Sequence, residues 1–464
     1  MRPRPEILPR VARKRLPSAP NMVRVYDAAM PTAKPLTRGR APRRDEPRAV
    51  SRDANLLVGA QAISSFGSFI TRSALPLLAI LGLGVTPIEA ALLAAVDLMA
   101  AALISQFAGV WIDRLPRRPL LITADLARAA LLGSIPASAL LFGGVTLPHL
   151  IFVSAASGAC TTAFDIAERS YLVGLVPAPK LRRILARLLG IRGAAEFFGF
   201  GVAGLLVARI GGPAAIGVDA LTYVASAALL TLLRVREPAL PPTSARKSVR
   251  YEVVDGLRRT WAEQPLRPLL FSGAVIGLYF GLFRSSYMLF LTRGLGLGPE
   301  AIGAIAAVGG IAAFSGGILT ERFSRWLGLG RSLAVSYALV GAGLLLVPLS
   351  PGPTLLGFAM LIGHQLLSDG FETVWEANQA TIRARLIPDA YQGRSNAAFE
   401  GVGILARLTG IVVGGLIGSS ASGSGASLVV GGLAAVLVGL YLGLSPLGRL
   451  RSIADLKVTR PRSS

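Results

Sequence analysis

The segment at residues 109–118 reads Gly109-Val-Trp-Ile-Asp113-Arg114-Leu-Pro-Arg117-Arg118. It is a short polar loop between two apolar runs, and each run has the roughly 20 residues that cross a hydrocarbon core of about 30 Å. One acid and three arginines in so tight a loop indicate a connection between two membrane-spanning helices. A similar set of residues recurs in the second half of the chain, at Gly317, Glu321, Arg322 and Arg325.

The composition also indicates a membrane protein. Of the 464 residues, 52% are hydrophobic and 16% are charged, and the mean hydropathy is +0.58. Soluble proteins of this length carry more charge. In a soluble chain the net charge of +23 would suggest nucleic acid. Here the basic residues fall mostly between apolar runs or in the tails, so topology explains them and no nucleic-acid partner is expected.

Several functional classes lack their residues in this sequence. One cysteine, Cys160, and two histidines are too few and too scattered for a zinc site. No phosphate-binding loop of the G-x-x-x-x-G-K-[ST] type is present, so the sequence encodes no ATP-driven pump. There is also no Ser/His/Asp arrangement. We therefore expect no metal, no cofactor and no enzymatic activity.

The apolar runs predict twelve spanning helices. The first six lie near 55–82, 88–111, 119–142, 147–168, 190–210 and 214–234, and the others near 268–292, 299–320, 331–349, 353–377, 396–418 and 425–446. The predicted domains are a disordered basic cytoplasmic tail at 1–52, a six-helix bundle at 53–234, a cytoplasmic amphipathic linker at 235–267, a second six-helix bundle at 268–446 and a basic cytoplasmic tail at 447–464.

Arginine and lysine are distributed unevenly between the two sides of the membrane. They concentrate in the 2–3, 4–5, 8–9 and 10–11 loops and in the central linker, whereas only Arg209 and Arg293 lie near loops of the other side. Because basic loops stay in the cytoplasm, both termini are predicted to be cytoplasmic in a multi-pass protein of the cell membrane.

The two halves match each other at a nearly constant offset, which indicates a duplicated transporter fold. The matching pairs are Arg72 with Arg284, Pro87 with Pro299, Gly109 with Gly317, Asp113 with Glu321, Arg114 with Arg322, Arg117 with Arg325, and Asp165 with Glu376.

The loop at 109–118 resembles the signature G-x-x-x-D-[RK]-x-G-R-[RK] of the major facilitator superfamily, with Pro116 in place of the usual glycine. The resemblance covers about residues 53–446 and is closest to bacterial drug and siderophore exporters of the enterobactin and macrolide type, through D-R-L-x-R-R-P-L-L at 113–121. It implies an all-α integral membrane protein with 12 transmembrane helices in two pseudo-symmetric six-helix bundles.

The same resemblance implies a gate. In the family the loop acid lies against the start of helix 11, and the second arginine pairs with an acid at the end of helix 4. The alternative is that these charges only anchor loops at the headgroups. Carried over by position, the gating residues are Gly109, Asp113, Arg114, Arg117, Arg118 and Asp165, with Glu321, Arg322, Arg325 and Glu376 in the second half.

A second set of charged or polar residues lies inside the predicted spans, where charge is costly and usually functional. The candidates for substrate binding or proton coupling are Arg72, Asp97, Glu196, Arg284, His364, Glu372, Glu400 and Arg407. Each has the alternative role of a structural ion pair or an interfacial anchor. Glu196 and Arg407 occupy equivalent positions of the repeat with opposite charge, so a pair across the halves is possible.

These features predict a secondary active transporter that exports a small amphipathic or anionic compound, such as a drug, siderophore or secondary metabolite. Proton antiport with alternating access is the expected mechanism, and the expected partners are substrate, protons and lipid, with a monomeric chain. A facilitator or importer of the same fold is the nearer alternative, and a membrane receptor or membrane enzyme the more distant one. Arg72 and Arg284 favour an anion unless Asp97 and Glu196 neutralise them.

Overall fold

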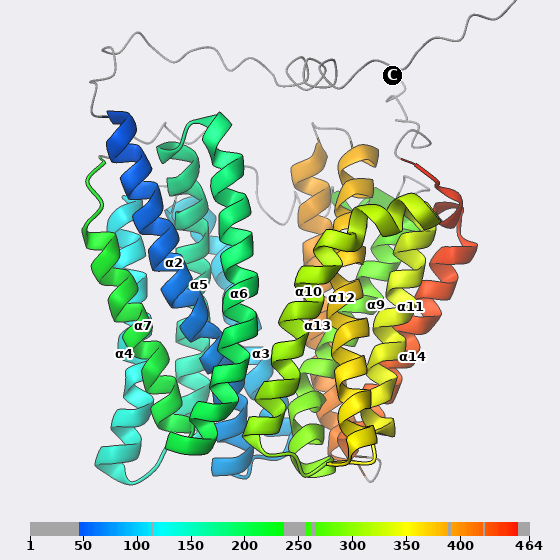
Figure 1. Ribbon diagram of the computed structural model, residues 1–464, viewed down its shortest axis with the longest axis horizontal. Helices are drawn as coiled ribbons and strands as arrows, with labels where there is room; N and C mark the ends of the chain where they lie inside the picture. Colours follow the sequence, from blue (N-terminus) through cyan, green and yellow to red (C-terminus); the bar gives the residue numbers. More distant parts are fainter. Residues whose placement is uncertain are drawn as a thin grey trace, which may run out of the picture. The chain divides into compact units, whose positions relative to one another are not determined.

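The computed structural model describes residues 46–112, 115–235, 256–258, 260–261, 266–387, 391–420 and 423–452. Within these ranges the chain forms twelve long α-helices and no β-strand (Figure 1). The first half contains α2 (Glu46–Leu77), α3 (Pro87–Ile112), α4 (Arg117–Phe142), α5 (Leu147–Leu175), α6 (Ala178–Ile210) and α7 (Gly212–Thr231). The second half contains α9 (Leu266–Leu289), α10 (Pro299–Leu327), α11 (Leu329–Leu349), α12 (Leu355–Leu386), α13 (Gln392–Gly418) and α14 (Gly423–Leu444). The predicted all-α fold is confirmed.

Eleven of the twelve long helices in the described part are apolar enough to cross a membrane. The exception is α12, whose 32 residues span about 48 Å at 1.5 Å per residue and are therefore long enough. Its hydropathy is lowered by His364, Gln365, Asp369 and Glu372, which follow one another along the middle of the helix. Polar residues concentrate on this helix, which makes it a candidate for function.

Helix pairing repeats between the halves. In the first half α4 contacts α7 and α5, and α3 contacts α5; in the second half α11 contacts α14 and α12, and α10 contacts α12 in the same way. Figure 1 shows the first six helices grouped together and the last six grouped together. The internal repeat read from the sequence therefore corresponds to a repeat of packing.

The connection after the first helix of each half shows the same repeat in detail. Helix α2 continues into the π-helical turn η1 (Leu78–Gly82), and α9 continues into η2 (Phe290–Gly294). Each is followed by a glycine with positive φ, Gly84 at 66° and Gly296 at 67°. An L-residue rarely adopts this conformation, so glycine ends both elements before the next helix begins at a proline.

The helices run between two ends of the bundle. The motif end is defined by the segment at 109–118, where α3 ends and α4 begins. The opposite end is defined by Pro87 and Pro299, which begin α3 and α10. The chain from Arg48 onward forms one compact unit that includes both halves.

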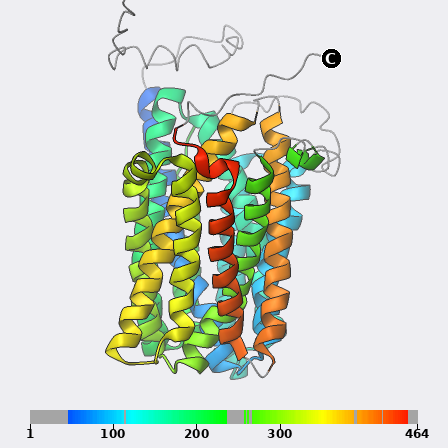
Figure 2. The ribbon, with the colours of Figure 1, turned by 90° about the vertical axis from the view of Figure 1, so that its right-hand side faces the viewer.

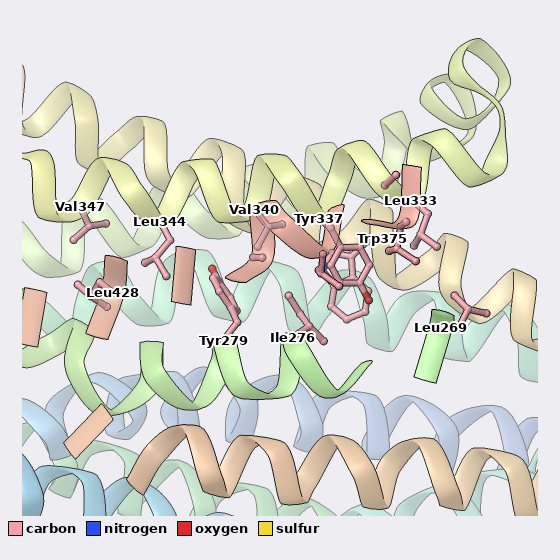
Figure 3. Close-up of a cluster of buried hydrophobic side chains, with 14 of the residues drawn as sticks. Leu269, Ile276, Tyr279, Leu333, Tyr337, Val340, Leu344, Val347, Trp375 and Leu428 are labelled. Atoms are coloured by element: carbon pink, nitrogen blue, oxygen red, sulfur yellow. The ribbon is translucent and has the colours of Figure 1, made fainter. Parts of the chain in front are cut away.

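The core of the second half fills the space between α9, α11, α12 and α14. Tyr337 and Trp375 lie together, with ring centroids 5.2 Å apart, and Leu344 and Leu428 are fully buried (Figure 3). Figure 2 shows α14, in red, running along the face of this bundle. Between membrane-spanning helices such side chains stabilise the bundle through close van der Waals packing, and this packing supports the charged residues on α9 and α12.

Candidate functional site

The two halves touch closely near the opposite end. Helix α6 packs against α10, and a Cβ on Gly204 would lie 2.3 Å from the carbonyl oxygen of Pro299 and 2.8 Å from the Cα of Gly303. Helix α3 packs against α13, where a Cβ on Gly415 would lie 2.6 Å from Ala91. Small residues at these positions let the helix backbones approach, so the halves are sealed together at this end.

Polar contacts across the halves add to the seal at the opposite end. Arg293, just after α9, donates hydrogen bonds to the carbonyl oxygens of Val85 at 2.8 Å and Ile80 at 3.4 Å. Arg209 and Glu300 form an exposed ion pair at 3.6 Å. Exposed ion pairs contribute about 0–1 kcal/mol, so the arginine bonds to backbone and the glycine contacts hold this end together.

Asp97 on α3 and Arg284 on α9 form an ion pair between the two halves. Their side chains remain 33% and 41% exposed on the surface of the chain, although the pair lies within two spanning helices. A charge pair inside a membrane protein is usually functional. Arg284, one of the two arginines expected to attract an anion, is therefore neutralised by Asp97 in this structure.

Arg72 lies on α2, with its guanidinium 5.1 Å from the ring centre of Phe69. It interacts electrostatically with Glu196 and with Arg192, both on α6.

No ion pair joins Glu196 to Arg407 within the described residues. Glu196 interacts instead with Arg72 and Arg192 of its own half. The side chain of Arg407 lies over the ring of Phe280 on α9. The possible pair between Glu196 and Arg407 is thus not formed.

A cavity of about 80 Å³ opens between α2, α4, α5 and α6 of the first half. Arg72, Arg192 and Asp165 line it together with Arg128 of α4. Arg128 is buried and paired with Asp125, and its guanidinium lies between the rings of Phe164 and Tyr223. Burial between two aromatic rings fixes this cation in position.

The acids of the second half gather on α12. Glu372 interacts electrostatically with Asp369 and Glu376 of the same helix and with Arg407 of α13. Asp369 contacts α10, where its Oδ2 would lie 2.0 Å from a Cβ on Gly309, and it interacts with Glu196 across the halves.

Glu400 and His364, two of the predicted site residues, differ in their exposure. Glu400 is exposed on α13 and interacts with Arg407. His364 is only 1% exposed, and its Nδ1 lies 3.0 Å from the hydroxyl of Ser368. It packs beside Tyr287, with ring centroids 5.4 Å apart. The structure therefore places His364 in the packed interior, not on the charged cavity.

The structure describes only some of the residues assigned to the gate. Asp113 and Arg114 lie outside the described residues, and Gly109 lies in the last turns of α3. The guanidinium of Arg117 approaches Gly174 near the end of α5, where a Cβ would lie 3.3 Å from its Nη1. Arg118 donates a hydrogen bond of 2.6 Å to the carbonyl oxygen of Thr231.

The acids assigned to the gate have other neighbours here. Asp165 lines the cavity of the first half, nine residues and about 13 Å along α5 from Gly174. In the second half Arg325 pairs with Glu321 at 3.8 Å, because the two are one turn apart on α10. Glu376 interacts with Arg407 instead, and Arg322 is exposed near the end of α10.

Sequence reasoning missed three residues of the charged site: Arg128, Arg192 and Asp369. Arg128 follows Asp125 by three residues, the spacing at which helix side chains meet, so this pairing was readable. Arg192 follows a run of loop arginines, so from its position in the sequence it is expected only to help set the orientation of the protein in the membrane. Asp369 precedes Glu372 by three residues and Glu376 by seven, a spacing that places all three acids on one face of a helix and could have revealed them as a group.

Two pseudo-symmetric six-helix bundles, in contact at one end and carrying paired, partly exposed charge within their spanning helices, define a multi-pass membrane transport protein. The model of the Major Facilitator Superfamily matches residues 57–375. The chain belongs to this family.

Relatives and solved structures agree with that assignment. The MFS-type transporter YfiS of Bacillus subtilis is 24% identical over 403 residues, which cover 83% of this chain and 91% of YfiS. The multidrug efflux pump Tap of Mycolicibacterium fortuitum is 23% identical over 317 residues, covering 66% of this chain and 76% of Tap. A bacterial homologue of the iron transporter ferroportin, solved in an inward-facing state, has a TM-score of 0.67 at 17% identity and covers 85% of this chain and 99% of its own.

The nucleoside transporter NupG has a TM-score of 0.62 at 12% identity, covering 85% of this chain and 98% of its own. At such identities the structural likeness supports the fold alone.

Proposed function

We propose that the protein exports a small amphipathic organic compound across the cell membrane by proton antiport with alternating access. The observation that carries this proposal is the Asp97–Arg284 ion pair, which joins the two halves within their spanning helices and remains partly exposed. Movement of the halves against each other must break or remake such a pair, so it links the charge of the cavity to the conformation.

The conformation fits one step of that cycle. Glycine contacts seal the opposite end, and the arginine-rich loops favour a cytoplasmic location for the motif end. The structure then corresponds to a state that faces the cytoplasm. In such a state we expect the gating pairs at the motif end to be open; within the described residues no ion pair joins Arg325 to Glu376, and Arg325 pairs with Glu321 instead.

The direction of transport is proposed from the relative Tap, whose name describes a multidrug efflux pump. The charges of the cavity support an amphipathic substrate, because Asp97 pairs with Arg284, and Glu196 interacts electrostatically with Arg72 without forming an ion pair. We expect the protein to act as a monomer, with the tails at 1–52 and 447–464 and the linker at 235–267 in the cytoplasm.

Glu196 is our proposed proton carrier. It forms no ion pair within the described residues, and it interacts electrostatically with Arg72 and Arg192 of its own half and with Asp369 and Glu372 of the other half. A proton on Glu196 removes its attraction to the arginines and its repulsion of the two acids. Protonation therefore changes the balance of charge between the halves.

The test is substrate flux in everted membrane vesicles with and without a proton gradient, measured with a panel of fluorescent amphipathic drugs. We expect gradient-driven accumulation in the wild type and its loss in Glu196→Gln, with substrate binding retained. Glu89→Gln is the matched control, because Glu89 lies in the first turn of α3 and belongs neither to the proposed gate nor to the proposed coupling residues. Gradient-driven accumulation that survives in Glu196→Gln would move the carrier to Asp97, Asp369 or Glu372, and flux without a gradient would favour a facilitator.

A further inference from the structure

The cavity of the first half contains one fixed cation and two further arginines. Arg128 is held by Asp125 and by the rings of Phe164 and Tyr223, and its Nη1 lies 3.5 Å from the hydroxyl of Thr161. Its Nε is buried and has no hydrogen-bond acceptor among the described residues. Arg128 is thus a fixed positive charge at the lining of the cavity.

Arg72 and Arg192 line the same cavity. Within the described residues neither of them donates a hydrogen bond or lies within 4 Å of a carboxylate oxygen. Arginine carries five N–H donors and stays protonated in proteins. These two guanidinium groups, which have no hydrogen-bond acceptor in the described part of the chain, therefore line one small cavity. Phe69 lies beside them and offers an apolar surface.

Hydrogen-bond acceptors also line the cavity. Ser64, Ser68 and Thr161 donate their hydroxyl protons to carbonyl oxygens of their own helices. Their oxygens remain acceptors. Gln61 adds a buried Oε1 that has no partner among the described residues, and Asp165 adds a carboxylate. A ligand group that enters the cavity must therefore donate hydrogen bonds to these acceptors and accept hydrogen bonds from the arginines.

We propose that this cavity binds the head group of the substrate, and that the head group is an acid that also carries a hydroxyl. The carboxylate or an equivalent oxyanion accepts from Arg72 and Arg192, for which planar two-oxygen groups are the best match. The hydroxyl donates to Gln61 or Asp165. The inference rests on the proposed transport function and names the class of substrate.

The size and charge of the cavity set the limits of this head group. About 80 Å³ holds several water-sized groups, since a single water needs about 10–15 Å³ of such space. The carboxylate of Asp165 and the nearby Glu196 offset two of the arginine charges. A carboxylate alone would leave the acceptors Gln61 and Asp165 without a donor, whereas a hydroxyl on the same ligand gives them one.

The experiment uses four matched probes: mandelate, its amide mandelamide, phenylacetate, which lacks the hydroxyl, and (2-hydroxy-2-phenylethyl)trimethylammonium. Binding to the purified full-length protein in nanodiscs is measured by calorimetry without any proton gradient. We expect mandelate to bind at least about tenfold tighter than the cation and severalfold tighter than phenylacetate and mandelamide, since a hydrogen bond to a charged group is stronger than one between neutral groups.

Arg192→Gln and Arg72→Gln should each weaken mandelate binding about tenfold and leave mandelamide nearly unchanged. Arg187→Gln is the matched control, because Arg187 is exposed on the same helix and does not line the cavity. Arg192→Lys keeps the charge and loses the fork, so mandelate binding should recover only partly. Thermal unfolding in nanodiscs shows whether each variant is folded.

Tighter binding of the cation than of mandelate by the wild type would overturn the head-group assignment, as would unchanged mandelate binding in folded Arg192→Gln. Because binding is measured without a gradient, a failure of proton antiport leaves these results intact. Gradient-driven efflux of cations alone would retain the transport function and remove the proposed head group.

Discussion

The arginines in the middle of this protein differ in how their charge is balanced by acids. Four arginines inside the spanning helices differ in their partners. Arg128 pairs with Asp125, and Arg284 pairs with Asp97 across the halves. Arg72 and Arg192 have no ion-pair partner in the described part. Removing one member of a buried pair costs more than removing both, because the remaining charge stays unbalanced. The consequences of substitution should therefore differ between these residues.

Asp97→Asn should reduce gradient-driven flux in everted vesicles by at least about tenfold, because it leaves Arg284 without its partner between the halves. Arg284→Gln should have a similar effect. The double variant Asp97→Asn with Arg284→Gln should recover part of the flux, since neither charge then remains unpaired. Single variants that transport at the wild-type rate would contradict a role for the pair in the transport cycle.

Arg117→Ala should sharply reduce flux while the protein remains in the membrane, because the signature loop would lose the arginine that reaches α5 near Gly174. Arg325→Ala should have a weaker effect, since its partner Glu321 is exposed on the same helix and such a pair contributes about 0–1 kcal/mol. Arg187→Gln again serves as a control for loss of a cytoplasmic charge. Flux unchanged by Arg117→Ala would remove the gating assignment.

Pairs of helices, not single helices, form the contacts that seal one end. Helix α6 meets α10 through Gly204 and Gly303, where no side chain larger than hydrogen fits. The same helix carries Gly193, around which a Cβ would meet nothing within 4 Å. Glycines on one helix thus have different roles that only their neighbours reveal.

Gly204→Ala should lower both transport and the apparent melting temperature, because its Cβ would overlap the carbonyl oxygen of Pro299 and force α6 away from α10. Gly193→Ala is the control; it should be neutral or stabilise by up to about 1 kcal/mol through helix propensity. Flux assays and thermal unfolding of both variants in nanodiscs measure the difference. Equal behaviour of the two variants would show that the α6–α10 contact does not limit function.

The whole molecule is a pair of repeated bundles whose two ends differ in charge and contact. The arginine-rich motif end is predicted to face the cytoplasm, whereas the opposite end is sealed by glycine contacts. A closed end and accessible central charges are what alternating access requires of one state.

A cysteine introduced at Pro353, which is exposed in the loop between α11 and α12 at the opposite end, should react with a membrane-impermeant thiol reagent from outside intact cells. Ser452→Cys, after α14, should react only in everted vesicles. Both variants are made with Cys160 replaced by serine. Labelling of Ser452→Cys from outside would reverse the predicted orientation, and a mixed pattern would mean that the number of spans is wrong.

The sequence by itself determined the class of fold. Apolar runs of spanning length, glycine and proline at matching places in the two halves, and the signature at 109–118 are local or periodic features, and local features are readable along a chain. The Asp125–Arg128 pair is of this kind, because three residues place both side chains on one face of α4.

Only the tertiary structure decided which distant charges meet. Asp97 and Arg284 are 187 residues apart, and the rotation of α3 and α9 about their axes brings them together. Rotations of the same kind kept Glu196 from Arg407, although the repeat places them at equivalent positions. Asp165, assigned to the gate by its position, joined Arg72 and Arg192 at a cavity for the same reason. Helix packing sets these rotations through contacts spread over many residues, and so the sequence predicted the charged residues but not their partners.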